Sequence, residues 1–323
     1  MTTPRRVVAL SGGIGGAKLA LGLARVLPPA DLVVVANPGD DFEHLGLTVC
    51  PDLDTLMYTL AGLANPEAGW GRANESWNFM AALQALGGET WFNLGDGDLA
   101  LHVERSRRLA RGETLSAITA DVCRRLGITA RVLPASDQPV RTIVETADGP
   151  LAFQHYFVRD RAAPKVVGFR FEGAQRARPL PALIEALSDP ALLAVVVCPS
   201  NPFISIDPML AIPGLRDAIA QAEAPVIAVS PIVGGRAIKG PTAKMLAELG
   251  HEVSAEAVAR HYGGLIDGFV LDHADAALGE PVRSLGLEVL VIDTIMADDA
   301  AKERLAAEVL DFARLLSRRR SSD

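Results

Sequence analysis

Hydrophobic residues along the chain gather in short uninterrupted runs, separated by longer stretches with helical periodicity. Runs of this length without polar interruptions are typical of strands that are buried on both faces of a parallel sheet. They cover residues 7–10, 32–36, 90–94, 192–198, 226–229, 269–271 and 289–292. The periodic stretches predict helices at residues 18–26, 55–63, 77–86, 99–111, 116–126, 215–222 and 300–316. The alternation predicts an α/β protein with a doubly wound, mostly parallel sheet.

One region, residues 131–190, departs from this alternation. Segments 141–146 and 151–157 flank a turn with Asp148 and Gly149, which is the pattern of an antiparallel hairpin, and 165–171 is a further alternating strand. The sequence therefore predicts an antiparallel β insertion on a Rossmann-like core. We expect one composite domain, residues 1–323, with the core at about 1–130 and 191–295, the inserted segment at about 131–190 and a C-terminal helix at about 300–316.

Composition narrows the class of protein. With 323 residues and 49% hydrophobic content, the chain can bury a large core. No apolar run approaches the roughly 20 residues that span a bilayer, and the first strand begins too early for a signal peptide. A net charge of −8 disfavours nonspecific nucleic-acid binding, and three widely spaced cysteines are typical of buried residues in a reducing compartment. We expect a cytoplasmic protein that binds neither nucleic acid nor membrane.

A glycine-rich turn follows the first strand and is the strongest sign of function. Ser11 is followed by Gly12, Gly13, Gly15 and Gly16, and then by a helical pattern. Such a turn lets backbone N–H groups at a helix N-terminus approach a phosphate closely. A purely structural turn is the alternative.

The turn fits neither standard nucleotide-binding template. A Walker A loop needs Gly-Lys followed by Ser or Thr, whereas Lys18 here follows Ala17. A dinucleotide fingerprint starting at Gly13 needs Gly or Ala where Lys18 stands, and an acid where the second strand ends in Asn37. The sequence thus predicts phosphate binding without a classical NAD site. Lys18 is either a partner for the phosphate or a solvated surface lysine.

Six aspartates follow the expected ends of neighbouring strands and need a cation or protons between them. They are Asp40, Asp41, Asp52, Asp54, Asp96 and Asp98. Carboxylates beside a phosphate suit Mg²⁺, and Asp54 is the best single candidate. The alternatives are that Asp52 and Asp54 only cap a helix and that Asp96 and Asp98 only form turns.

Six motifs in order and spacing resemble those of the 2-phospho-L-lactate transferase family, which builds the deazaflavin coenzyme F-420. The motifs are Ser11-Gly12-Gly13-Ile14-Gly15-Gly16, Pro51-Asp52-Leu53-Asp54-Thr55, Leu94-Gly95-Asp96-Gly97-Asp98-Leu99-Ala100-Leu101-His102, Leu133-Pro134-Ala135-Ser136-Asp137, Pro199-Ser200-Asn201-Pro202 and Ser230-Pro231-Ile232. The resemblance runs from the first strand to about Asp272.

The resemblance implies a cytoplasmic, Mg²⁺-dependent homodimer. It would transfer a phospholactyl, phosphoenolpyruvyl or phosphoglyceryl group from a guanosine diphosphate-linked donor to the ribityl hydroxyl of the deazaflavin Fo, releasing GMP. Family positions imply that Asp40 and Asp54 hold Mg²⁺ and that Asp54 lies close to the Fo hydroxyl, as ligand, orienter or general base. The substrate-binding residues implied are Gly12, Gly13, Gly15, Gly16, Lys18, Asp54, Asp96, Asp98, Ser200 and Asn201.

The chain departs from the family pattern at two positions. Similar sequences usually carry Arg or Lys where this chain has Gly97, and threonine where it has Leu101. The missing cation would need a replacement beside the transferred phosphate, for which Arg105 and Lys18 are candidates. A different function class, a non-catalytic nucleotide-sugar-binding regulator, shares a similar glycine turn and is the alternative hypothesis.

Overall fold

The computed structural model describes residues 5–67 and 69–320, so both ends of the expected domain, 1–4 and 321–323, lie outside the described residues. A seven-stranded sheet in the order β14-β13-β10-β9-β1-β2-β5 forms its centre, and all neighbouring strands pair in parallel. Its strands are β1 (Arg6–Ser11), β2 (Leu32–Ala36), β5 (Arg131–Pro134), β9 (Leu192–Val197), β10 (Val226–Val229), β13 (Gly268–Asp272) and β14 (Glu288–Ile292). The predicted doubly wound α/β fold is confirmed. The strand order reverses between β1 and β9, and ligands of such sheets bind at this point.

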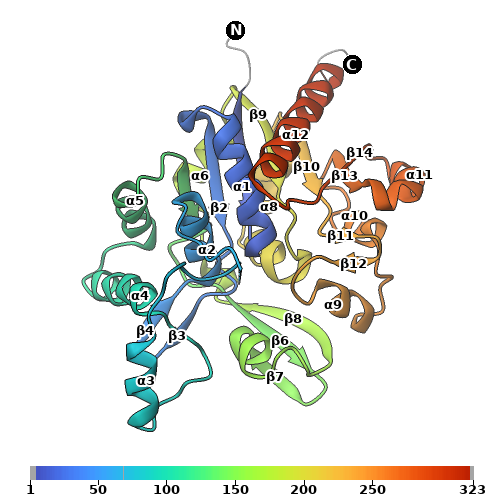
Figure 1. Cartoon of the computed structure of the whole chain (residues 1–323). Helices are drawn as coiled ribbons and strands as arrows, with labels where there is room; N and C mark the ends of the chain where they lie inside the picture. The colour runs from blue at the N-terminus through green and yellow to red at the C-terminus, as the bar shows by residue number, and fades with distance from the viewer. Residues whose placement is uncertain (1–4, 68, 321–323) are drawn as a thin grey trace.

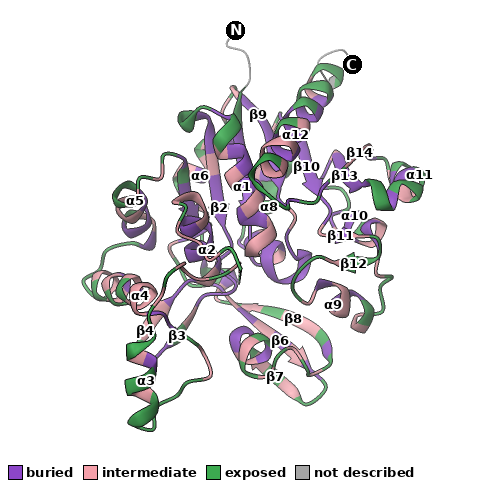
Figure 2. Cartoon of the chain, viewed as in Figure 1, coloured by how far each residue is buried: buried purple, intermediate pink, exposed green. Residues whose placement is uncertain are grey.

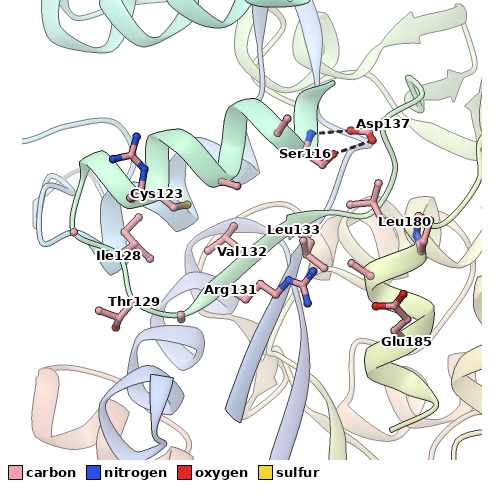
Figure 3. Close-up of a pocket in the computed structure, with 17 residues that line it drawn as sticks. Ser116, Cys123, Ile128, Thr129, Arg131, Val132, Leu133, Asp137, Leu180 and Glu185 are labelled. Carbon is pink, nitrogen blue, oxygen red and sulfur yellow. Dashed lines mark hydrogen bonds between the residues drawn. The ribbon is translucent and has the colours of Figure 1, made fainter. Parts of the chain in front are cut away.

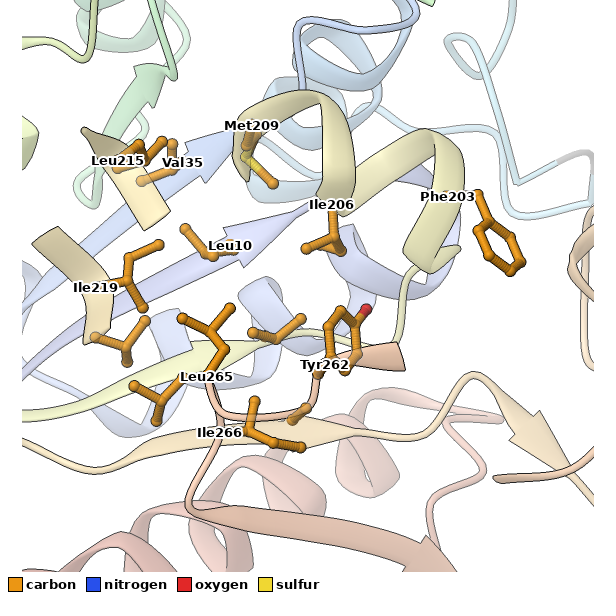
Figure 4. Packing of buried hydrophobic residues seen from close by; sticks show 14 of the residues in the cluster. Leu10, Val35, Phe203, Ile206, Met209, Leu215, Ile219, Tyr262, Leu265 and Ile266 are labelled. Atoms are coloured by element: carbon orange, nitrogen blue, oxygen red, sulfur yellow. The ribbon is translucent and has the colours of Figure 1, made fainter. Parts of the chain in front are cut away.

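Helices cover both faces of the sheet (Figure 1), which explains why its strands read as uninterrupted apolar runs. Val7 and Ala9 pack on one face, and Val8 and Leu10 pack on the other. The first face is covered by α1 (Gly13–Val26), α2 (Pro51–Leu60), α5 (Leu115–Arg125) and α12 (Asp299–Arg320). The second is covered by α6 (Pro181–Leu187), α7 (Asp207–Leu210), α8 (Leu215–Ala220), α9 (Thr242–Glu248) and α10 (Ala255–His261). The strands are the most continuously buried elements in Figure 2, and Figure 4 shows Leu10 packed among residues of the second face.

The predicted antiparallel insertion is present as a three-stranded sheet below the central one in Figure 1. It consists of β6 (Arg141–Thr146), β7 (Gly149–Ala152) and β8 (Val166–Glu172) in the order β7-β6-β8. Two predicted boundaries of this insertion were wrong. Residues 131–134 pair with β2 as an edge strand of the core, so the insertion starts later. The second hairpin strand ends at Ala152, because the chain turns into the helical segment η2 (His155–Arg159), which buries Tyr156 in the core.

The prediction of a strand at residues 90–94 was also wrong. This apolar run is irregular, because Trp91 and Phe92 pack against Phe42 at ring-centroid distances of 6.1 and 4.8 Å instead of joining the sheet. Asp96 and Asp98 therefore do not follow a strand. They lie in the first turn of α4 (Asp96–Leu109), which begins earlier than its apolar periodicity predicts.

The remaining elements are short and lie mainly at the edges of the molecule. They are α3 (Asn78–Ala85), α11 (Gly279–Arg283), β3 (Phe42–His44), β4 (Leu47–Val49), β11 (Ile232–Val233), β12 (Arg236–Ala237), η1 (Pro29–Asp31), η3 (Ala174–Arg176), η4 (Pro202–Ile206) and η5 (His273–Leu278). Among the helices of residues 5–67 and 69–320, none is long and apolar enough to cross a membrane.

Candidate active site

The glycine turn lies where β1, β9 and α2 meet. The hydroxyl of Ser200 accepts a hydrogen bond from Gly12 N–H at 3.2 Å and donates one to Gly12 O at 2.8 Å. Gly13 N–H donates to Asp52 Oδ1 at 2.8 Å, and Gly13 has a φ of +65°, which favours glycine. A Cβ at Gly15 would lie 2.4 Å from Pro199 O, so this turn packs directly on the exit of β9. The structure thus brings Ser200 to the predicted phosphate turn.

Two other predicted substrate residues are held by protein groups. Lys18 Nζ donates to Met296 O at 3.0 Å, and burial, followed by the charges of Lys302 and Lys239, lowers its pKa. Lys18 is therefore not a fully solvated surface lysine. The side chain of Asn201 accepts a hydrogen bond from Phe203 N–H and caps η4, so its contact with a nucleotide stays a prediction.

Asn37, Asp40 and Asp52 form a buried cluster, the Asn37 group, beside the glycine turn. The amide nitrogen of Asn37 donates to Asp40 Oδ1 and Asp52 Oδ2, both at 2.9 Å, and to Ile204 O at 3.0 Å. Burial raises the pKa of Asp52 to about 6. Burial and the charges of Asp52 and Asp41 raise the pKa of Asp40 well above its usual range. The group therefore retains protons readily in the absence of a cation.

A second cluster, the Asp54 group, consists of Asp54, Tyr58, Asp98, His102 and Arg105 and joins α2 to α4. Both carboxylate oxygens of Asp54 accept hydrogen bonds from the Arg105 guanidinium, one of them at 3.0 Å. His102 Nδ1 lies 3.6 Å from Asp54 Oδ2, and His102 Nε2 lies 3.3 Å from Asp98 Oδ1. Tyr58 donates its hydroxyl proton to Asp98 Oδ1 at 2.6 Å.

The protein's own cations govern the charge of this group. Burial alone would raise the pKa of Asp98, but the hydrogen bond and charge of His102, with Tyr58 and Arg105, bring it below its ordinary value. Burial would lower the pKa of Arg105, yet Asp54 and its neighbours raise it above the usual range. From the sequence, His102 and Tyr58 have no predicted site role, and Arg105 is predicted only as a replacement cation. The sequence signal for His102 and Arg105 is their spacing from Asp98, which places all three on one face of α4.

The Asp54 group offers ligands that fit a divalent cation. Within the described part of the chain, Asp54, Asp98 and His102 form the one group of three or more such residues whose ligand atoms lie within 4.8 Å of one another. The nearby Asp41 Oδ1 is buried without a hydrogen-bond partner. Two carboxylates and an imidazole suit divalent metals. Asp40 lies in the Asn37 group, so the predicted Mg²⁺ pair of Asp40 and Asp54 stays a prediction.

Asp96 lies outside both clusters. It accepts hydrogen bonds from Ser76 Oγ at 2.6 Å and from the N–H groups of Phe79 and Asn78 at 3.0 and 3.1 Å. These contacts, that of Ser76 first, lower the pKa of Asp96 to about 2. Asp96 thus holds the start of α3, and its predicted contact with substrate stays a prediction.

Two of the cavities in the described part of the chain bear on where the site lies. One of about 750 Å³ lies at the edge strand β5 between α5 and α6, lined by side chains such as Cys123, Ile128 and Leu180 (Figure 3). None of the predicted site residues, all of which the structure describes, lines it. A smaller cavity of about 130 Å³ is lined by Trp70, Arg72 and Asp98, among others. We place the candidate site at the Asp54 group and this smaller cavity, because the titratable groups converge there.

Comparison with known proteins decides the family. The family model for 2-phospho-L-lactate transferase CofD matches residues 7–310. The chain belongs to this family. It is 44% identical over 315 residues to a phosphoenolpyruvate transferase of Streptomyces griseus, covering 95% of this chain and 98% of the relative. It is 42% identical to one of Thermobifida fusca (97% and 99% covered) and 38% identical to one of Mycolicibacterium smegmatis (95% and 98% covered).

Among solved structures, a UPF0052 family member from Bacillus halodurans matches with a TM-score of 0.61 and 15% identity, covering 97% of this chain and 99% of that one. A second structure of a Bacillus halodurans protein matches with a TM-score of 0.63 and 17% identity, covering 95% and 100%. At this identity the likeness shows the fold alone. The family membership makes this CofD-family chain an enzyme, a transferase.

Proposed function

We propose that this transferase moves a phosphoenolpyruvyl group from a guanosine diphosphate-linked donor to the ribityl hydroxyl of Fo, releasing GMP, in coenzyme F-420 biosynthesis. The observation that carries the proposal is the Asp54 group, in which a buried carboxylate, an arginine and a histidine converge at α2, the helix whose Asp52 also accepts a hydrogen bond from the glycine turn. The names of the relatives favour phosphoenolpyruvate over phospholactate or phosphoglycerate as the three-carbon acid.

Attack of a hydroxyl on a diphosphate depends mainly on positioning and charge neutralisation. The first turn of α1 would bind the diphosphate. The N–H groups of Gly12 and Gly13 already donate to Ser200 and Asp52, so those of Ile14 and Gly15 are the ones we expect to face the phosphate. The ammonium group of Lys18, on the same helix, would add positive charge.

Asp54 would orient the acceptor hydroxyl. Both of its oxygens accept hydrogen bonds from Arg105, which fixes the carboxylate and favours a positioning role over proton acceptance. Mg²⁺ would be held by Asp54 and Asp40, as the family positions imply, and would neutralise charge on the diphosphate when bound. Asp98 competes with Asp40 as the second ligand, because its oxygen lies with those of the Asp54 group.

The test is product identification. The protein is incubated with Fo, Mg²⁺ and each guanylylated donor in turn, made from phosphoenolpyruvate, phospholactate or phosphoglycerate, and the products are analysed by mass spectrometry. We expect the phosphoenolpyruvyl adduct of Fo and one GMP per adduct. Absence of adduct with all three donors, together with calorimetric binding of a UDP-sugar, would favour the regulator hypothesis instead.

The homodimer and the cytoplasmic location remain predictions. The three cysteines, all unpaired and buried, agree with a reducing compartment.

A further inference from the structure

The space beside Gly97 is filled by side chains from another segment. A Cβ at Gly97 would lie 3.4 Å from the guanidinium carbon of Arg72 and 3.0 Å from Glu75 Oε1. Both residues belong to the loop between α2 and α3, far from α4 in sequence. A cation therefore stands next to position 97, although that position itself has no side chain.

Glu75 explains how this arrangement is held in place. Its carboxylate accepts hydrogen bonds from the N–H groups of Gly97 at 2.6 Å and Asp98 at 2.9 Å, so it caps the N-terminus of α4. The contacts of Arg72 with its neighbours are longer. Its Nη1 donates to Gly97 O at 3.3 Å, and its Nε lies 3.7 Å from Glu75 Oε1. The capping carboxylate fixes the place of the guanidinium without occupying all of its donors.

Arg72 also faces the small cavity next to the Asp54 group. Its guanidinium lies 5.6 Å from the ring centroid of Tyr58, whose hydroxyl bonds Asp98, and its side chain is 32% exposed. Of the described residues that line the cavity, Arg72 is the one with a basic side chain. Whole small-molecule ligands usually need about 300–1,000 Å³, so a cavity of about 130 Å³ suits one group of a larger ligand.

We propose that Arg72 binds an oxyanion of the substrate in this cavity, either the carboxylate or the phosphoryl group of the three-carbon acid. A guanidinium presents paired N–H donors that match the paired oxygens of both groups. Arg72 thereby supplies, from a neighbouring loop, the positive charge that Gly97 lacks. The inference rests on the function proposed above and adds a substrate-binding residue to it.

The test is a rescue experiment in the transfer assay with the phosphoenolpyruvyl donor. Arg72→Ala is expected to lower kcat/KM about ten- to hundredfold, the usual cost of a lost hydrogen bond to a charged group. Adding Gly97→Arg to Arg72→Ala should recover at least a third of that loss on a logarithmic scale, because the new side chain can enter the vacated space. Gly97→Arg alone should lower kcat/KM, because its Cβ would lie 3.0 Å from Oε1 of the capping Glu75 and its side chain would have to share the space that Arg72 fills. Arg107→Ala is the control, since Arg107 pairs with Glu104 on the surface of α4.

Two results would overturn the inference. One is kcat/KM for Arg72→Ala within twofold of the wild-type value. The other is a loss that neither Gly97→Arg nor Arg72→Lys recovers in part, which would make Arg72 a structural residue of the loop.

A binding measurement separates failure of this inference from failure of the proposed function. Phosphoenolpyruvate alone is titrated into the same variants while the fluorescence of Trp70 and Trp77, which line the cavity, is followed. We expect about tenfold weaker binding in Arg72→Ala than in Arg107→Ala, whether or not transfer occurs. Equal binding in the two variants would contradict a role for Arg72. Competition by inorganic phosphate identifies the phosphoryl group as the bound anion, and its absence identifies the carboxylate.

Discussion

Two clusters of aspartates share the first turn of α2 and are stabilised in different ways. In the Asn37 group, a neutral amide bridges Asp40 and Asp52. In the Asp54 group, Arg105 binds Asp54 through both oxygens, and His102 stands between Asp54 and Asp98. Both clusters draw on the first turn of α2, from which Asp52 reaches the glycine turn and Asp54 reaches α4.

The difference separates two kinds of carboxylate. Without a bound cation, the Asn37 group relieves its charge by retaining protons, as the raised pKa of Asp52 and Asp40 indicates. In the Asp54 group, Arg105 neutralises the charge of Asp54 even without a bound metal. We infer that the Asp54 group carries the positioning chemistry, while the Asn37 group responds to pH and to metal.

The largest expected effect is on turnover. Asp54→Asn should lower kcat by about a thousandfold or more, because it removes the carboxylate charge from both the hydroxyl and the metal. Steady-state transfer assays measure this, with circular dichroism to show that the fold is retained. Asp96→Asn is the matched control and should stay within a few-fold of wild type, since Asp96 lies outside the Asp54 group and holds the start of α3. A near wild-type rate for Asp54→Asn would remove it from the mechanism.

Loss of Arg105 should destabilise the fold. Arg105 is 1% exposed, and Arg105→Met leaves the buried Asp54 without its cation, which costs about 3–5 kcal/mol. Denaturant unfolding measures the change, and combining it with Asp54→Asn should restore part of the stability. Arg107→Met on the surface of the same helix should cost about 1 kcal/mol or less. A similar loss of unfolding free energy in both arginine variants would mean that the buried Arg105–Asp54 pair contributes no more to stability than a surface ion pair.

The buried carboxyl groups of Asp52, in the Asn37 group, and of the neighbouring Asp41 make the stability of the fold depend on pH. Burial raises the folded-state pKa of Asp52 to about 6 and of Asp41 to about 7, above an unfolded value of about 3.9. Their protonation therefore stabilises the fold fully below about pH 4, and this stability is lost as the pH rises through 6 to 7. In EDTA, unfolding at pH 5 should require about 1–3 kcal/mol more than at pH 8. Asp41→Asn should reduce this difference, and equal or greater stability at pH 8 would refute the explanation.

Metal dependence gives the smallest expected effect and decides between two ligands. Asp40→Asn should raise the Mg²⁺ concentration for half-maximal activity about tenfold, roughly the cost of one ligand contact. Asp98→Asn, tested in parallel, should shift it less. The reverse order would place the second ligand in the Asp54 group itself and leave the Asn37 group as a scaffold of the glycine turn.

The sequence predicted correctly those strands whose two faces are both buried. Strands β1, β2 and β9 are buried on both faces, so their apolar runs identify them. Strand β5 escaped notice because Arg131 and Pro134 bound a run of only two apolar residues. Residues 90–94 were wrongly predicted as a strand, because Trp91 and Phe92 pack in an aromatic cluster and not in a sheet. This packing depends on the tertiary structure and cannot be read from the apolar run.

At the candidate site, too, local motifs could be found from the sequence, whereas contacts that depend on tertiary packing could not. Asp54 and Asp98 could be found by motif, since the first turns of α2 and α4 carry them. Their partners Arg105 and His102 could not be assigned, because the pairing depends on which face of α4 packs toward α2. The contact of Arg72 with Gly97 was equally hidden, since a loop distant in sequence supplies the arginine.

The most direct test of the division between the two clusters is to locate the metal. Crystals grown with Mn²⁺ and GDP would show the ion by anomalous scattering. We predict a peak within about 2.0–2.3 Å of a carboxylate oxygen of Asp54, the range for such ligands. A peak bound only by Asp40 and Asp52, with Asp54 still closed on Arg105, would contradict the assignment of the transfer site to the Asp54 group.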